Sequence, residues 1–154
     1  VRSGDAADDV GGGGAALPRI ALSGVLVIDA SAAVDLCLSV EGFATLADQD
    51  LHAPPLIRSE SLAALHEMRW RGEIPEEMAE VGLRRRGGWP IAVEERAALY
   101  EEAWEVAEEF GWAKTYDAEY VALARALGCR LLTTDERLWR GTQCLGFVVT
   151  PIEL

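Results

Sequence analysis

The strongest constraint on the fold of this chain is a pattern that occurs twice: a short apolar run, then an aspartate, then a helical stretch. The run VLVI at 25–28 is followed by Asp29, and the run at 130–133 is followed by Asp135. A continuous apolar run of this length is typical of a parallel strand that is covered on both faces. Helices that connect such strands supply the cover, so the pattern predicts an α/β architecture.

The rest of the chain continues the alternation of strands and helices. We predict a three-layer α/β sandwich around a mostly parallel central sheet. Ser31 and Thr115 are the expected caps of the helices that they begin, and Gly128 is the expected stop of the second. The predicted strands are 25–28, 51–53, 89–93, 130–133 and 146–150, and the predicted helices are 31–38, 56–70, 75–86, 94–110 and 115–127, with one more beginning after Asp135.

Two of these helices have a predicted packed face. Helix 56–70 is expected to bury Leu62, Leu65 and Met68 with Ala64, because these residues recur at helical spacing. Helix 115–127 carries one such stripe and a second one beside it. The stripes are Tyr116, Tyr120, Leu123 and Leu127, and Val121 with Ala124.

The length of 154 residues fits one domain, which we expect to span residues 24–154. Residues 1–23 contain the run 11–14 of four glycines and little that could be buried, so we interpret them as a flexible Gly-rich tail or an expression remnant. A phosphate-binding loop would have to follow a strand and open a helix, and this run does neither.

Composition narrows the classes of site and partner. The three cysteines are far apart and set among apolar residues, which favours reduced thiols, and the absence of close Cys or His pairs disfavours a zinc site. The net charge of -12 argues against a broad basic surface for nucleic acid. The chain has neither a long apolar run nor a basic-then-apolar start, so we expect a cytoplasmic protein with no membrane partner.

Four carboxylates are expected at one edge of the sheet. Asp29 and Asp135 follow parallel strands, whose carboxyl ends meet at the same edge. Asp117 lies in the first turn of a helix that opens near that edge, and the helix dipole favours its charge there. Glu60 lies in an otherwise apolar helix, where a carboxylate is costly unless it is paired or bound to a cation. Glu67 competes with it on nearly the same face, but Glu60 is nearer the strand ends.

Clustered carboxylates repel each other and raise one another's pKa. A Mg²⁺ or Mn²⁺ ion removes that repulsion, because such hard cations prefer oxygen ligands. An ion of this kind suits phosphoryl chemistry, since it polarises a phosphate and activates a bound water. The sequence therefore predicts a metal-dependent hydrolytic site built on Asp29, Glu60, Asp117 and Asp135.

Each of these residues also has a simpler interpretation. Asp29 and Asp135 are well placed to cap the helices that follow them. Asp117 is a favourable first-turn charge, and Glu60 fits a solvated position. These interpretations stay open one by one, but a common edge accounts for all four residues together.

Other charged and aromatic groups have weaker signals. The run Arg84, Arg85 and Arg86 fits a helix carboxyl end, and it also holds the best candidates for contacting an RNA backbone. The glutamates of 94–110 fit a solvated helix face. The five tryptophans fit core or dimer contacts, with stacking on bases as the alternative.

The segment YDAEYVALARALGCRLLTTDERL at 116–138 resembles the Tyr-Asp-Ala block, apolar helix and Thr-x-Asp block of PIN-domain ribonucleases, and in particular of VapC-type toxins of type II toxin–antitoxin modules. VIDASA at 27–32 and SESLAAL at 59–65 are similar to the earlier acidic motifs of that family.

The resemblance implies a PIN-like fold over 24–154 and specific site residues. Asp29, Glu60, Asp117 and Asp135 correspond to the family's metal-binding acidic quartet, and the hydroxyl residues beside it are Ser31, Thr133 and Thr134. It also implies endonucleolytic cleavage of RNA by metal-activated water with Mg²⁺ or Mn²⁺, a homodimer, and inhibition by a cognate VapB-type antitoxin whose segment covers the groove and inserts an arginine.

Two alternatives stay open. A catalytically silent PIN-fold module would act only by binding its protein partner. A phosphotransfer domain of aspartate type is disfavoured, because the residues after the first strand are Asp29-Ala30-Ser31, where a haloacid-type phosphatase has Asp-x-Asp. A receiver domain has a lysine after a late strand, and the single lysine here, Lys114, precedes a helix.

Overall fold

A computed structural model describes residues 24–154 of the chain, and the prediction for residues 1–23 lies outside the described residues. Its centre is one sheet of five strands in the order β3-β2-β1-β4-β5, and every neighbouring pair is parallel. The strands are β1 Val25–Ile28, β2 Asp50–Ala53, β3 Ile91–Val93, β4 Arg130–Leu132 and β5 Val148–Val149.

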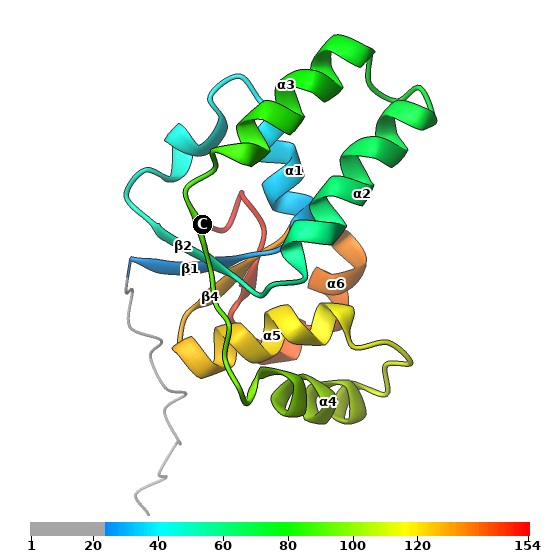
Figure 1. The fold of residues 1–154 in the computed structure, drawn as a ribbon. Coiled ribbons are helices and arrows are strands. Elements are labelled where there is room, and N and C mark those ends of the chain that lie inside the picture. The colour runs from blue at the N-terminus through cyan, green and yellow to red at the C-terminus, as the bar shows by residue number, and fades with distance from the viewer. Residues whose placement is uncertain (1–23) are drawn as a thin grey trace, which may run out of the picture.

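Helices cover both faces of this sheet (Figure 1). Helices α1, α2 and α3 lie on one side, and α4 and α5 lie on the other. Their bounds are α1 Ala30–Leu38, α2 Ile57–Trp70, α3 Glu76–Gly87, α4 Leu99–Phe110, α5 Tyr116–Leu127 and α6 Glu136–Gly141, with 3-10 turns at Gly42–Leu46 and Gln143–Leu145. The predicted three-layer α/β sandwich is confirmed. None of the helices in residues 24–154 has the length and apolar character needed to cross a bilayer.

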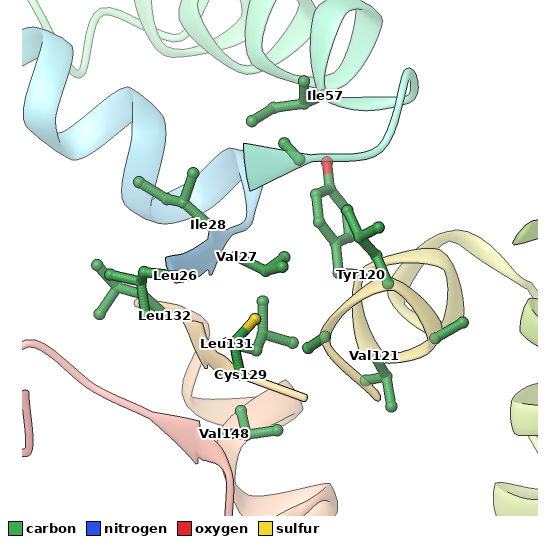
Figure 2. Packing of buried hydrophobic residues seen from close by; sticks show 14 of the residues in the cluster. Leu26, Val27, Ile28, Ile57, Tyr120, Val121, Cys129, Leu131, Leu132 and Val148 are labelled. Atoms are coloured by element: carbon green, nitrogen blue, oxygen red, sulfur yellow. The ribbon is translucent and has the colours of Figure 1, made fainter. Parts of the chain in front are cut away.

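The core is built around the two central strands. Leu26, Val27 and Ile28 of β1 and Leu131 of β4 are fully buried, as both faces of a covered parallel strand should be. Figure 2 shows these side chains between the helix layers, with the ring of Tyr120 from α5 beside Val27. Burial of this apolar surface is the main source of stability for such a domain.

Helix α5 is more deeply buried than its predicted stripes suggest. Seven consecutive residues, 118–124, are buried, because this helix lies between the sheet and α4 (Figure 1). Tyr116, expected in the packed stripe, is instead 51% exposed. The predicted stop at Gly128 is confirmed, since this residue takes a left-handed conformation with φ of +63° that favours glycine.

The predicted caps differ from the observed ones. Asp29 rather than Ser31 caps α1, because its carboxylate accepts from the backbone N–H of Ala32 while Ser31 lies inside the helix. Thr115 occupies the cap position of α5, but its backbone is already helical and its side chain makes no capping hydrogen bond. Its hydroxyl is therefore not the signal that starts this helix.

The face of α2 that is buried also differs from the predicted one. Leu65 is buried as expected, but Leu62 is 47% exposed, and the other buried residues are Ile57 and Ser61. Leu65 packs under α3 at Gly82, where a Cβ would lie only 3.0 Å from side-chain carbons of Leu65 and Leu38. This glycine lets α3 approach α1 and α2 closely, so tertiary packing decides which face of α2 is covered.

Helix α4 begins at Leu99 rather than at the predicted residue 94. Glu94 instead extends the edge of the sheet: its N–H donates to the carbonyl of Ala53, and its carboxylate is hydrogen-bonded to Nδ1 of His52 at 2.6 Å. These contacts hold the segment after β3 in an extended form. The helix starts only after the chain has left the sheet.

The strand order places a crevice at the centre of the sheet. From β1 the chain moves through β2 to β3 on one side, and later returns to place β4 on the other side of β1. Ligands of open parallel sheets bind beyond the carboxyl ends of the strands at such a reversal. Asp29 follows β1 and Asp135 follows β4, so both aspartates lie at this crevice.

Candidate active site

Asp29 is the buried anchor of the site. Its Oδ1 accepts hydrogen bonds from Ser31 Oγ at 2.7 Å and from the N–H of Ala32 at 2.9 Å, and its Oδ2 accepts from Thr133 Oγ. The residue is 5% exposed. Burial raises the pKa of this carboxyl to about 6, although the hydrogen bonds oppose the rise.

Thr133 joins the two strand-end aspartates. Its hydroxyl donates to Asp29 and accepts from the N–H of Asp135 at 3.0 Å, and it is fully buried. Asp135 caps α6 by accepting from the N–H groups of Arg137 and Leu138. Capping is therefore a real role of both aspartates, and it fixes where their carboxylates point.

The other two hydroxyl residues of the predicted site differ from each other. Ser31 Oγ accepts from the N–H of Thr134 at 3.1 Å while it donates to Asp29, so it ties the start of α1 to the end of β4. Thr134 contributes this N–H, and its side chain is not among the hydrogen-bonded groups of residues 24–154. The network around Asp29 thus uses Ser31 and Thr133 by their side chains and Thr134 by its backbone.

Glu60 is held toward the same edge by Tyr120. The phenol of Tyr120 donates to Oε2 of Glu60 at 2.7 Å, and its ring is part of the core beside β1 (Figure 2). Burial raises the pKa of Glu60, the hydrogen bond from Tyr120 opposes this, and the negative charge of Asp117 raises it further. Glu67, the competing candidate, is exposed and paired with Arg71. The geometry therefore favours Glu60 over Glu67.

Asp117 is electrostatically coupled to the other three carboxylates. It raises the pKa of Asp29 and of Glu60, and its own pKa is raised first by burial and also by the charge of Asp135, with Arg137 opposing. The contacts agree with this: Arg137 lies against both Asp117 and Asp135, Glu60 and Asp117 line one groove, and Thr133 joins Asp29 to Asp135. The structure thus gathers the four predicted residues at one edge of the sheet.

A divalent cation fits the chemistry of this group. The donors are all carboxylate oxygens, which Mg²⁺ and Mn²⁺ prefer, and their mutual repulsion is what a cation would relieve. Within residues 24–154, however, no three Asp, Glu, His or Cys side chains converge closely enough to clasp an ion. The reason is local: Asp29 is turned toward its hydroxyl partners, Glu60 toward Tyr120, and Asp135 toward the first turn of α6.

Residues 26–141 match the family model of the PIN domain. The chain belongs to the PIN-domain family. It is 36% identical over 119 residues to VapC ribonuclease Mb0985 of Mycobacterium bovis, an alignment that spans 74% of this chain and 88% of the relative. Ribonuclease VapC3 of Mycobacterium tuberculosis is 34% identical over 131 residues, which spans 79% of this chain and 92% of that relative. The resemblance that the sequence motifs carried is confirmed.

A solved structure supports the same assignment of fold. The crystal structure of PAE2754 from Pyrobaculum aerophilum superimposes with a TM-score of 0.63 at 26% sequence identity. The match covers 81% of this chain and 87% of that protein. The PIN architecture therefore accounts for nearly all of the described sheet and its helices.

This PIN domain holds three residues near its acidic edge that sequence reasoning did not assign there. Tyr120 was placed in the core, yet its hydroxyl holds Glu60; its position three residues after Asp117 puts both on one helix face, which was an available signal. Glu119 is 8% exposed, and burial and the charge of Glu60 raise its pKa. Arg137 lies 3.4 Å from Asp117 and 3.7 Å from Asp135. The local sequence gives no signal from which that ion pair could be predicted.

The three arginines predicted to contact RNA make different contacts in the structure. Arg85 donates to the carbonyls of Cys37 and Ser39 at the carboxyl end of α1, whose amino end carries Asp29. Arg86 donates to Ser61 Oγ and to the carbonyl of Arg58 on α2, and its guanidinium lies over the ring of Trp89. Arg84 lies 4.0 Å from Glu80 and is exposed. Two of the three thus hold helices together.

The tryptophans also separate into two groups. Trp89, Trp112 and Trp139 are half-buried and pack against the core, as predicted. Trp70 and Trp104 are 80% and 63% exposed, so the core interpretation is wrong for these two. Both lie on the outer surfaces of helices, where the neighbouring helices of this PIN domain do not reach.

Proposed function

We propose that this PIN domain is the endoribonuclease toxin of a toxin–antitoxin module, with Mg²⁺ or Mn²⁺ as cofactor. The observation that carries the proposal is the group of four coupled carboxylates, Asp29, Glu60, Asp117 and Asp135, beyond the carboxyl ends of β1 and β4. Two relatives that align over most of this chain are named ribonucleases, which supports RNA as the substrate.

Each residue has a defined task in this proposal. The four carboxylates would hold the cation, which would supply a Lewis acid for the scissile phosphate and a more acidic bound water. Ser31 and Thr133 orient Asp29 through their hydroxyl groups, and Tyr120 orients Glu60. Such outer contacts fix the direction and the basicity of metal-binding groups.

Arg137 neutralises part of the charge of this edge before the cation arrives. Its guanidinium lies against Asp117 and Asp135, and its side chain is 81% exposed, so it is free to leave. The same ion pairs show that a guanidinium fits beside these carboxylates. That supports the proposal that a cognate VapB-type antitoxin neutralises the enzyme by placing an arginine there.

The remaining partners follow from the same assignment. We expect the enzyme to act on cytoplasmic RNA as a homodimer. Cys37 and Cys129 are free and buried, which is consistent with a reducing compartment. Analytical ultracentrifugation of the antitoxin-free protein tests the dimer directly.

The experiment that tests the nuclease is cleavage of RNA by the antitoxin-free chain. Cleavage should appear with Mg²⁺ or Mn²⁺ and should vanish with EDTA and with Asp29→Asn. Cleavage that persists under either change would contradict the proposed mechanism.

A matched pair of variants tests the choice between the two glutamates of α2. Glu60→Gln should abolish cleavage, because Glu60 faces Asp117 from beside Tyr120, whereas Glu67→Gln should leave it unchanged, because Glu67 is paired with Arg71 on the outer side. Equal losses in the two variants would remove Glu60 from the site.

One observation favours a second candidate, a catalytically silent module that acts by binding its partner. No three metal-binding side chains of the described residues converge on one point. Isothermal calorimetry with Mg²⁺ and Mn²⁺ separates the two functions. A nuclease should bind the metal ion, and the binding should be lost when the site carboxylates are replaced. If neither binding nor cleavage occurs, the silent module is the correct assignment.

A further inference from the structure

We propose that Lys114 and Tyr116, at the junction of α4 and α5, form a subsite that binds the RNA nucleotide next to the scissile phosphate. The inference rests on the proposed function and names residues that bind its substrate. It starts from a groove of about 520 Å³ that is bordered on one side by Glu60 and Asp117. The groove therefore continues directly from the acidic edge.

The walls of this groove have the chemistry of a nucleotide site. Its lining includes Trp112 and Lys114 between α4 and α5, Tyr116 at the start of α5, and Arg137 and Leu138 of α6. Single-stranded nucleic acid is typically bound by cations that contact its phosphates and by aromatic rings that stack on its bases. Both kinds of group are present here within a few residues of Asp117.

Lys114 differs from every arginine of residues 24–154. Each of these arginines is paired with a carboxylate or donates a hydrogen bond to the protein, whereas Lys114 does neither. Its ammonium group is exposed and lies over one face of the Tyr116 ring, 6.0 Å from the ring centre, so the contact is with an aromatic ring and not with a carboxylate. It is also the only lysine of a chain with a net charge of -12. An unpaired cation in a groove of a strongly acidic protein is a suitable contact for a phosphate.

The two aromatic residues of the groove differ in how they are held. Trp112 stacks on Phe110, with ring centres 4.9 Å apart and an angle of 26° between the planes, so the indole is fixed against the core. Tyr116 is 51% exposed, which leaves ring surface for a base. Together they give one fixed ring and one open ring, and an aromatic side chain loses little conformational entropy when a base stacks on it.

The experiment is a kinetic comparison on a short single-stranded RNA with Mg²⁺ at several salt concentrations. Lys114→Ala should raise KM roughly 3- to 10-fold with kcat unchanged, because a phosphate contact is lost. The slope of log KM against log salt should fall by about 0.7, as expected for one contact on a single strand. Lys114→Arg should restore both values. Arg71→Ala is the matched control, since it removes one positive charge at the far end of α2.

Tyr116 is tested with a second pair. Tyr116→Ala should raise KM about 5-fold or more, and Tyr116→Phe, which keeps the ring, should behave like the parent. If Lys114→Ala matches Arg71→Ala in both KM and salt slope, or lowers kcat instead, the subsite is overturned while the nuclease stands.

Fluorescence anisotropy of the same RNA without metal gives a readout that does not depend on cleavage. If no cleavage occurs but Lys114→Ala still weakens RNA binding relative to Arg71→Ala, the proposed function fails and the subsite stands. If the parent chain neither cleaves nor binds the RNA, both fail.

Discussion

Asp29 and Asp135 occupy equivalent places in the chain, yet the fold gives them different surroundings. Each follows a central strand, caps the next helix and shares the hydroxyl of Thr133 through its side chain or its backbone. Asp29 is 5% exposed and held by three donors, whereas the Asp135 side chain is 36% exposed and faces Arg137. The same local pattern thus produces one buried, constrained carboxylate and one open carboxylate, and burial makes the difference.

The largest effect should come from removing either charge. Asp29→Asn and Asp135→Asn should each reduce metal-dependent RNA cleavage at least about 1,000-fold, because a bound cation lowers the activation free energy by several kcal/mol. Single-turnover cleavage at saturating Mg²⁺ measures this. A variant of Asp135 that kept full activity would show that only the buried half of the pair is needed.

The two variants should differ in stability although they agree in activity. Ionised Asp29 has a pKa of about 6 in the fold against 3.8 normally, so its charge costs about 3 kcal/mol at neutral pH without metal. Asp29→Asn should therefore raise the free energy of unfolding at pH 7.5, while Asp135→Asn should leave it nearly unchanged, since Asn is an equally good cap. Urea denaturation in EDTA compares them.

The free energy of unfolding should also depend on pH through Asp29, by about 3 kcal/mol. Below the ordinary carboxyl pKa both folded and unfolded chains carry a protonated Asp29; as pH rises toward 6 only the unfolded chain releases the proton readily. The free energy of unfolding in EDTA should thus fall across this window and level off above pH 6. The difference between the parent and Asp29→Asn isolates this contribution. A difference that does not vary with pH would mean that Asp29 is not buried as described.

Thr133 is the link between the two aspartates, and its loss should have an intermediate effect. Thr133→Val keeps the shape but removes the hydroxyl that donates to Asp29 and accepts from Asp135, which should cost about 1–3 kcal/mol of stability. Thr134→Val is the matched control, because the Thr134 contact uses its backbone N–H. Thermal unfolding should separate the two, and equal melting temperatures would remove Thr133 from the network.

The smallest effect should come from Arg137 on the open side of the pair. Its ion pairs are exposed, so Arg137→Ala should change the free energy of unfolding by less than about 1 kcal/mol. It should tighten Mg²⁺ binding a few-fold, because a competing cation is gone. Calorimetric titration measures both the direction and the size. Weaker metal binding in this variant would show that Arg137 supports the site instead of competing for it.

Much of the fold was predictable because the signals are local. The run at 25–28 indicates a covered strand because its side chains are all apolar, and Gly128 indicates a helix stop because glycine adopts the left-handed conformation without strain. The start of α4 was not predictable in the same way, because Glu94 is kept extended by Ala53 and by His52, which lies 42 residues earlier in the chain. The burial of Leu65 likewise depends on a distant element, because α3 packs closely against it at Gly82.

In the candidate site, too, some features were predictable from local sequence and others were not. The positions of Asp29 and Asp135 follow from the rule that parallel strands end at one edge, and Glu60 was preferred over Glu67 on the same ground. The partners of these residues could not be read from the chain. The hydrogen bond from Tyr120 to Glu60 spans 60 residues, and the pairing of Arg137 with Asp117 depends on how α6 lies beside α5.

The sequence by itself determined the α/β class, the edge of the sheet that carries the acidic residues and the carboxylate chemistry of that edge. Only the tertiary structure decided which aspartate is buried, which hydroxyl groups hold it and where the unpaired Lys114 lies relative to the acidic edge. The physical reason is the distance along the chain over which each kind of interaction acts. Strand and helix preferences act over a few neighbouring residues, whereas burial and charge coupling depend on groups that meet only after the chain has folded.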